Sequence, residues 1–143
     1  MGQFQLANYS TNLFYYFALL PGIVFALLLY AGYAANHIQI NVSDDAVQLD
    51  GVLYGRTVSK SSLVLDGIRK VDVAADRELT PVKRTNGFGT SSIKYGWFTL
   101  QNGEKALLAL SDQQNAVYIP TTEGFALLVS PDNPDELVAK LRK

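Results

Sequence analysis

The sequence contains no cysteine and one histidine, His37, among its 143 residues. Disulfide bonds, thiolate catalysis and cysteine metal ligation are therefore excluded, and the redox state of the compartment stays open. With no second histidine and no cysteine, a transition-metal site lacks its usual ligands. A serine nucleophile would have to use His37 as its base, and no oxyanion-binding motif accompanies it. We expect neither a metal nor a cofactor.

Charge is also missing from the front of the chain. Residues 1–43 contain no Asp, Glu, Lys or Arg, and the first charged side chain is Asp44. The rest of the chain is long enough to bury a core, and the formal net charge is -1. Binding to nucleic acid requires clustered basic charge that displaces counterions. We therefore expect no nucleic-acid partner.

The charge-free region contains a long apolar run, LFYYFALLPGIVFALLLYAGYAA, over residues 13–35. At about 1.5 Å per residue a helix of this length reaches about 34 Å, which exceeds the hydrocarbon core of about 30 Å. Aromatic residues cluster at both ends of the run, as they do at membrane interfaces. Pro21 and Gly22 interrupt it, but both are tolerated in membrane helices. The sequence predicts a single-pass transmembrane helix over 13–35, after a tail at 1–12.

Two other interpretations of this run remain open. A signal peptide would carry a positively charged start and a shorter apolar run, although Gly32-Tyr33-Ala34 resembles a small-residue cleavage site. A buried core helix would show a polar second face, and none is visible. Orientation is hard to infer because no Lys or Arg occurs before Arg56, so the positive-inside rule has nothing to count.

Residues 36–143 are predicted to form a domain of short strands. Residues 36–42, NHIQINV, alternate between apolar and polar, which is typical of a half-buried strand. No flexible linker separates them from the apolar run, so we expect the domain to sit close to the bilayer. Turn signals recur at intervals of about 8 to 12 residues, as in a sandwich or barrel. Residues 77–92 are polar and contain Pro81 and two glycines, so we expect a long loop there.

The end of the chain predicts a helix over 133–142. Asp132 or Asn133 can cap its start, and Pro134 fits its first turn. Apolar side chains recur at helical spacing on one face, which requires a packing partner. The open end of a small barrel would provide one.

One glycine-rich segment and one basic cluster remain as candidate sites. In residues 84–92 a dinucleotide fingerprint would need a third glycine where Ser92 stands, and the following residues alternate as a strand, so we favour a plain turn over an enzyme's phosphate cradle. Lys83 and Arg84, together with Lys94, form a small basic cluster. It is interpreted as a solvated loop or as a contact for anionic lipid headgroups or a partner.

The pattern RTNGFGTSSIKYGWFTLQNGEKALLAL, followed by VYIPTTEGFALLVSPDNPDELVAKL, resembles the bacterial PH-domain-like family. The likeness runs from about Ile38 to Leu141. It consists of a glycine loop, a Gly-Trp-Phe strand, an Asn-Gly turn and a final hairpin that ends in Ser-Pro before the helix. The resemblance implies a mainly β fold: a strongly bent PH-like barrel of about seven strands with a C-terminal capping helix. It implies no catalytic activity, and membrane segments ahead of the domain are common in the family.

These observations lead to one functional prediction with two alternatives. We expect a non-catalytic, membrane-anchored PH-like domain that binds or assembles a protein partner at the membrane surface. One alternative is a barrel that binds a small molecule or lipid headgroup, although the acidic turn at residues 43–45 argues against phosphoinositide-type recognition. The other is an enzyme that uses the 84–92 glycine loop. The resemblance and the absence of cysteine favour a domain facing the cytoplasm, and the oligomeric state stays open.

Overall fold

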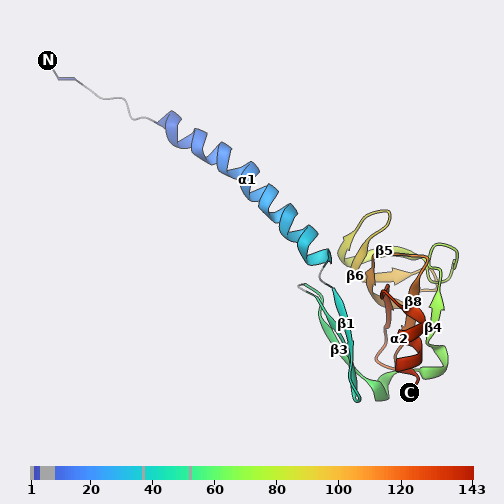
Figure 1. Ribbon diagram of the computed structural model, residues 1–143. Helices are drawn as coiled ribbons and strands as arrows, with labels where there is room; N and C mark the ends of the chain where they lie inside the picture. Colours follow the sequence, from blue (N-terminus) through green and yellow to red (C-terminus); the bar gives the residue numbers. More distant parts are fainter. Residues whose placement is uncertain (1, 4–8, 37, 52) are drawn as a thin grey trace. The chain divides into compact units, whose positions relative to one another are not determined.

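The computed structural model describes residues 2–3, 9–36, 38–51 and 53–143. The chain divides into two compact units, Met1–Asn36 and His37–Lys143. The first unit contains helix α1 (Tyr9–Asn36), which continues through Pro21 (Figure 1). Its stretch Phe14–Ala34 is the one helical segment, within the described ranges, that is long and apolar enough to cross a membrane.

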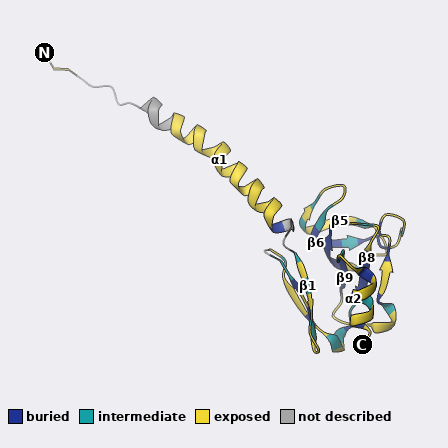
Figure 2. Cartoon of the chain, viewed as in Figure 1, coloured by how far each residue is buried: buried dark blue, intermediate teal, exposed yellow. Residues whose placement is uncertain are grey.

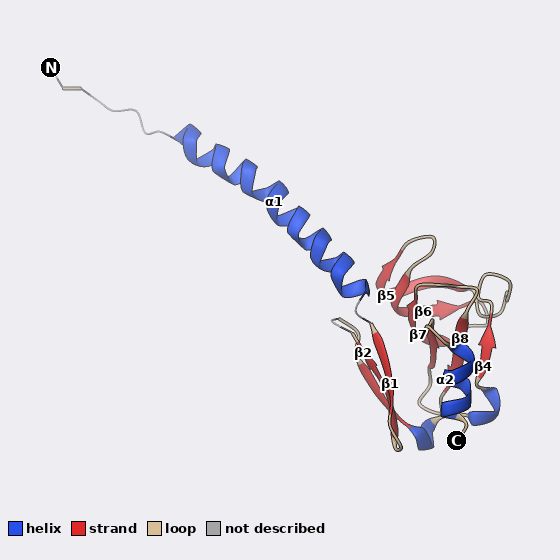
Figure 3. Ribbon diagram, in the orientation of Figure 1, coloured by secondary structure: helices blue, strands red, loops and turns tan. Residues whose placement is uncertain are grey.

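The second unit combines two sheets with a short terminal helix, as Figure 3 shows. In the described part of the chain it has nine strands, two 3₁₀ turns and one α-helix: β1 (Gln39–Val42), β2 (Ala46–Asp50), β3 (Arg56–Ser59), η1 (Lys60–Ser62), η2 (Leu65–Gly67), β4 (Arg69–Val71), β5 (Pro81–Gly89), β6 (Lys94–Leu100), β7 (Lys105–Leu110), β8 (Ala116–Pro120), β9 (Ala126–Val129) and α2 (Pro134–Leu141). The first sheet is antiparallel with the order β1-β2-β3, and the second has the order β4-β8-β9-β7-β6-β5.

The predicted barrel of about seven strands is wrong in two respects. The residues that the structure describes form nine strands, and their two sheets are not closed into a barrel. The mainly β character and the C-terminal helix are confirmed. The strand count was too low partly because residues 77–92 read as a loop, whereas residues 81–89 form β5.

The loop predicted over residues 77–92 rests on glycines that lie within strand β5. Gly87 lies opposite Gly96 of β6. A Cβ atom on Gly87 would lie 2.5 Å from the carbonyl oxygen of Tyr95, and Gly96 has a φ of +111°. The glycines therefore allow two strands to approach closely. Pro81 is the first residue of this edge strand, where its missing N–H is tolerated. Residues 84–92, the glycine loop of the enzyme alternative, thus lie largely within strand β5.

Strand β9 gives the second sheet its mixed topology. It lies between β7 and β8, parallel to β7 and antiparallel to β8. The connection from β7 to β8 must therefore pass the end of β9, and Ser130 holds it there. The N–H of Ser130 donates to the carbonyl oxygen of Ala109 at 3.0 Å, and its hydroxyl donates to that of Asp112. If each strand formed a hairpin with the next one, as the turn signals suggested, β8 and not β9 would lie beside β7.

The core consists of two apolar clusters on the two faces of the six-stranded sheet, whose central strands are buried (Figure 2). The first cluster joins both sheets to α2 and includes Val47, Leu49, Val58, Leu107, Ile119, Leu127, Leu137 and Leu141. The second cluster is covered by Val73 and Leu79, which precede β5. Fully burying one leucine or valine side chain stabilises the folded state by about 1.5 to 3 kcal/mol relative to leaving it exposed.

Helix α2 is fixed at both of its ends. Its N-cap is Asn133, one of the two candidates in the sequence, whose side-chain oxygen accepts from the N–H of Glu136 at 3.3 Å. The side-chain amide of Asn133 also donates to the Glu136 carboxylate at 3.2 Å, so two hydrogen bonds join these residues across the first turn, much as in a capping box. At the other end, the Arg142 guanidinium donates to the carbonyl oxygen of Ile68 at 2.6 Å. The helix is thereby held over the first cluster.

Candidate functional site

The first candidate site is a pocket of about 280 Å³ beside strand β5. We call it the basic pocket. It is lined by Pro81, Val82, Lys83, Arg84, Gly89, Thr90, Lys94 and Phe98.

The basic pocket brings together all three residues that the sequence singled out. Arg84 lies opposite Phe98 in the β5–β6 register, and Lys94 lies opposite Gly89. Lys94 is partly engaged, because its Nζ donates to the carbonyl oxygen of Thr90 at 3.0 Å. No Asp or Glu is among the residues that line the pocket. Such an arrangement can attract an anionic group, since nearby cations donate charge-assisted hydrogen bonds.

The shape of β5 explains why these cations converge. The strand has register shifts between Pro81 and Lys83 and between Arg84 and Asn86. Extra residues of this kind bend a strand, increase its twist and redirect its side chains. Val82, at the first shift, is 54% exposed. The pocket thus has an exposed apolar residue beside its cations.

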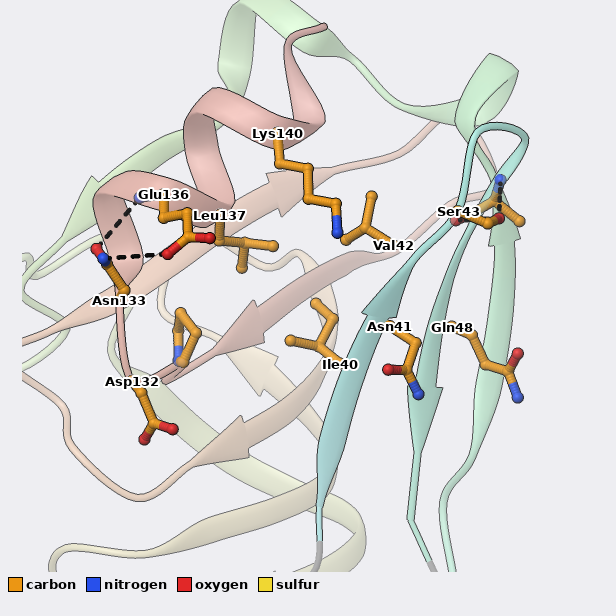
Figure 4. A pocket seen from close by; sticks show the side chains of 12 residues that line it. Ile40, Asn41, Val42, Ser43, Gln48, Asp132, Asn133, Glu136, Leu137 and Lys140 are labelled. Carbon is orange, nitrogen blue, oxygen red and sulfur yellow. Dashed lines mark hydrogen bonds between the residues drawn. The ribbon is translucent and has the colours of Figure 1, made fainter.

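The second candidate site is a groove of about 420 Å³ between β1 and α2, which we call the β1–α2 groove (Figure 4). It is lined by Ile40, Asn41, Val42, Ser43, Ala46, Gln48, Pro131, Asp132, Asn133, Glu136, Leu137 and Lys140. Its volume lies in the range of about 300 to 1,000 Å³ that is usual for binding pockets.

The apolar part of the groove comes from alternate residues of β1 and from α2. Ile40 and Val42 are half-buried and pack against the first core cluster, to which Leu137 also belongs. On the opposite face of the sheet, the amides of Asn41 and Gln48 both donate to the carboxylate of Asp50, at 2.7 and 2.6 Å. The strand is therefore held on its polar face and presents apolar side chains to the groove.

The charged residues of the groove come from α2 and from the segment just before it. Asp132 precedes the N-cap and Glu136 lies in the first turn, where an acidic side chain is favoured by the positive end of the helix dipole. Lys140 lies one turn beyond Glu136 and extends toward Val42 in Figure 4. The groove therefore has an acidic end and a basic end.

The β1–α2 groove is not predictable from local patterns in the sequence. The sequence predicts an alternating strand at 36–42 and an amphipathic helix at 133–142, but nothing in either pattern indicates that the two pack side by side. Each of the two predicted elements has an apolar face that needs a packing partner, and this shared requirement is the signal that could have suggested the groove. Among the described residues, no group of three or more His, Asp or Glu side chains is placed to hold a metal.

A family model described as Bacterial PH domain matches residues 38–143. The chain belongs to this family. The match covers most of the chain and confirms the resemblance read from the sequence. No curated protein and no solved structure matches the chain. Membership of the family supports a non-catalytic binding module in general terms, and the role of Lys83, Arg84 and Lys94 stays a prediction.

Proposed function

We propose that the protein is a membrane-anchored, non-catalytic binding module that presents its PH domain to a protein partner at the membrane surface. The observation that carries the proposal is the direct succession of its two parts. The apolar helix ends at Asn36, and the family match begins at residue 38. No Gly/Ser-rich linker separates the two in the sequence, so an anchored helix would keep the domain at the membrane surface.

The proposal requires α1 to remain attached as an anchor. A C-terminally tagged chain should stay in the membrane pellet after alkaline carbonate washing, at its full mass. Changing Val24→Arg together with Leu27→Arg should release it, because each arginine at the centre of a span costs about 2.5 to 3.5 kcal/mol. The matched control, Val24→Leu with Leu27→Val, should stay in the pellet. A shortened chain in the soluble fraction of the unaltered protein would instead identify a cleaved signal peptide.

We also propose that the PH domain faces the cytoplasm, which the absence of cysteine and the family resemblance support. Protease added to intact cells should leave a C-terminal tag uncut, and the same protease should remove it after lysis. Cleavage of the tag in intact cells, with a cytosolic marker protein spared, would place the domain outside and contradict this part of the proposal.

A second candidate function is contact between the basic pocket and anionic lipid headgroups. Lys83, Arg84 and Lys94 surround the pocket without an acidic residue in its lining, and Val82 stands exposed beside them. Each basic residue close to an anionic membrane contributes about 1 kcal/mol.

Flotation with vesicles tests this candidate on the His37–Lys143 unit, which has its own core. Lys83→Glu with Arg84→Glu should weaken binding to vesicles containing phosphatidylserine at least about tenfold, because two attractive charges become repulsive. Arg77→Glu with Lys143→Glu makes the same change in net charge outside the pocket and should have a smaller effect. Equal loss in both variants would show that net charge alone governs binding.

A further inference from the structure

We infer that the β1–α2 groove binds an extended segment of a partner protein, which adds to the free edge of β1 as an antiparallel strand. The inference rests on the proposed function, because it names the class of partner that the binding module takes.

The backbone of β1 directs hydrogen-bonding groups into the groove. The N–H of Ser43 donates to the carbonyl oxygen of Ala46 at 2.9 Å, which makes these two residues a hydrogen-bonded pair of the β1–β2 ladder. Such pairs alternate along an antiparallel ladder. Val42 and Ile40 are therefore in non-hydrogen-bonded positions, and their N–H and C=O groups point away from β2. Strand β1 is an edge of its sheet, so these groups face the groove.

An added strand would also place its side chains suitably. Residues directly opposite one another on neighbouring strands point to the same face of a sheet. Two alternate residues of the partner, opposite Val42 and Ile40, would thus face the apolar side of the groove beside Leu137. The residue between them would lie on the polar face near Asn41. Backbone pairing gives such complexes affinity, and the alternating side chains give specificity.

The charged residues beside the groove, Lys140 on α2 and Asp132 before it, favour one direction of the partner segment and one pattern of charge along that segment. An antiparallel segment meets Val42 first and Ile40 afterwards. Lys140 lies toward Val42, and Asp132 lies toward the start of the helix (Figure 4). The segment that fits has an acidic residue, then apolar residues at two alternate positions, then a basic residue. A small molecule would leave the row of backbone groups on β1 unused.

Selection from a random library of displayed 12-residue peptides, on the full chain in nanodiscs, tests the inference. We expect enrichment of peptides with the acidic, alternating apolar, basic order and without proline between the charges. The most enriched peptide should bind the Val42→Pro variant at least tenfold more weakly, because proline removes the N–H that the peptide needs and the β1–β2 ladder does not use. The Val42→Ile variant keeps that N–H and an apolar β-branched side chain, and should bind within about threefold of the parent.

A second variant keeps the test decisive if Val42→Pro does not fold. Lys140 is exposed, so Lys140→Glu should fold normally and lower the affinity of the same peptide about twofold to fivefold. A peptide with its acidic residue changed to lysine should regain affinity on this variant. Failure of the swap to restore binding would contradict the assigned direction.

Three outcomes would overturn the inference. They are no enrichment, equal binding to the parent and to a folded Val42→Pro variant, and a dimer of the full chain that Val42→Pro dissociates, which would assign the groove to a second copy. Carbonate extraction of the same protein separates these outcomes from failure of the proposed function. A chain that stays anchored but binds no peptide loses only the inference, whereas a cleaved chain that binds the peptide loses only the anchor.

Discussion

Strands β1 and β5 both lie at the edge of a sheet, yet their free edges are built differently. Strand β5 begins with Pro81, carries Lys83 and Arg84 and contains two register shifts. Proline, charge and bulges all discourage pairing with another strand. Strand β1 reads QINV, without proline, charge, glycine or a register shift. The comparison shows that the fold protects one edge and leaves the other able to pair.

The difference also separates the two candidate sites. The basic pocket lies beside the protected edge and offers cations, whereas the β1–α2 groove lies beside the open edge and offers backbone groups and apolar side chains. An anion suits the first surface and an extended peptide suits the second. The two proposed contacts, with anionic headgroups and with a partner segment, therefore use different surfaces of the domain.

The largest expected effect is at the close approach of β5 and β6. Gly96→Ala should destabilise the fold by about 3 kcal/mol, because the residue has a positive φ and its Cβ would lie 2.6 Å from the Asn86 carbonyl oxygen. Gly103→Ala is the matched control, with a φ of +84° and no atom within 4 Å of its Cβ. It should cost about 1 to 2 kcal/mol. Urea unfolding followed by Trp97 fluorescence measures both, and equal costs would show that the close approach is unimportant.

A proline scan of β1 should produce an alternating pattern. Asn41→Pro removes a ladder N–H and leaves a carbonyl group of β2 without its partner, whereas Val42→Pro removes an N–H that points outward. We expect Asn41→Pro to cost about 2 kcal/mol more than Val42→Pro in the same unfolding experiment. If the two cost the same, or their order is reversed, the register inferred for the free edge is wrong.

The smallest expected effect concerns the protection of β5. Lys83→Thr with Arg84→Thr should change the free energy of unfolding by less than about 0.5 kcal/mol, because both side chains are exposed. Sedimentation velocity should nevertheless detect increased self-association, since the edge loses its charges. The variant Lys83→Glu with Arg84→Glu keeps the edge charged and should remain as monodisperse as the parent. If both variants self-associate to the same extent, charge is not what prevents this edge from pairing.

The sequence supported the fold class and the family but not the topology. The helix cap was predicted because cap chemistry depends on a few adjacent residues, and the Asn-Gly turn of the family resemblance is the Asn102-Gly103 turn between β6 and β7. The glycines of β5 resemble turn residues in the sequence, because Gly87 meets Gly96 of β6 only through strand pairing. The insertion of β9 between β7 and β8 is likewise a contact that no local pattern encodes.

The two candidate sites also differ in whether the sequence predicts them. Lys83, Arg84 and Lys94 were predicted as a basic cluster because they lie close together along the chain, and the pairing of β5 with β6 brings them into one pocket. The β1–α2 groove joins residues from the two ends of the domain, and its pairing groups belong to the backbone. Backbone groups of an edge strand have no signature in a list of side chains, so this site required the structure.

Residue-resolved amide hydrogen exchange on the full chain tests the open edge of β1 most directly. The account predicts that Asn41 exchanges at least about tenfold more slowly than Ile40 and Val42, because only Asn41 donates into the ladder. Adding the selected peptide should then slow Ile40 and Val42 and leave Asn41 unchanged. Slow exchange at Ile40 and Val42 in the free protein would show that this edge is already covered and would contradict the account.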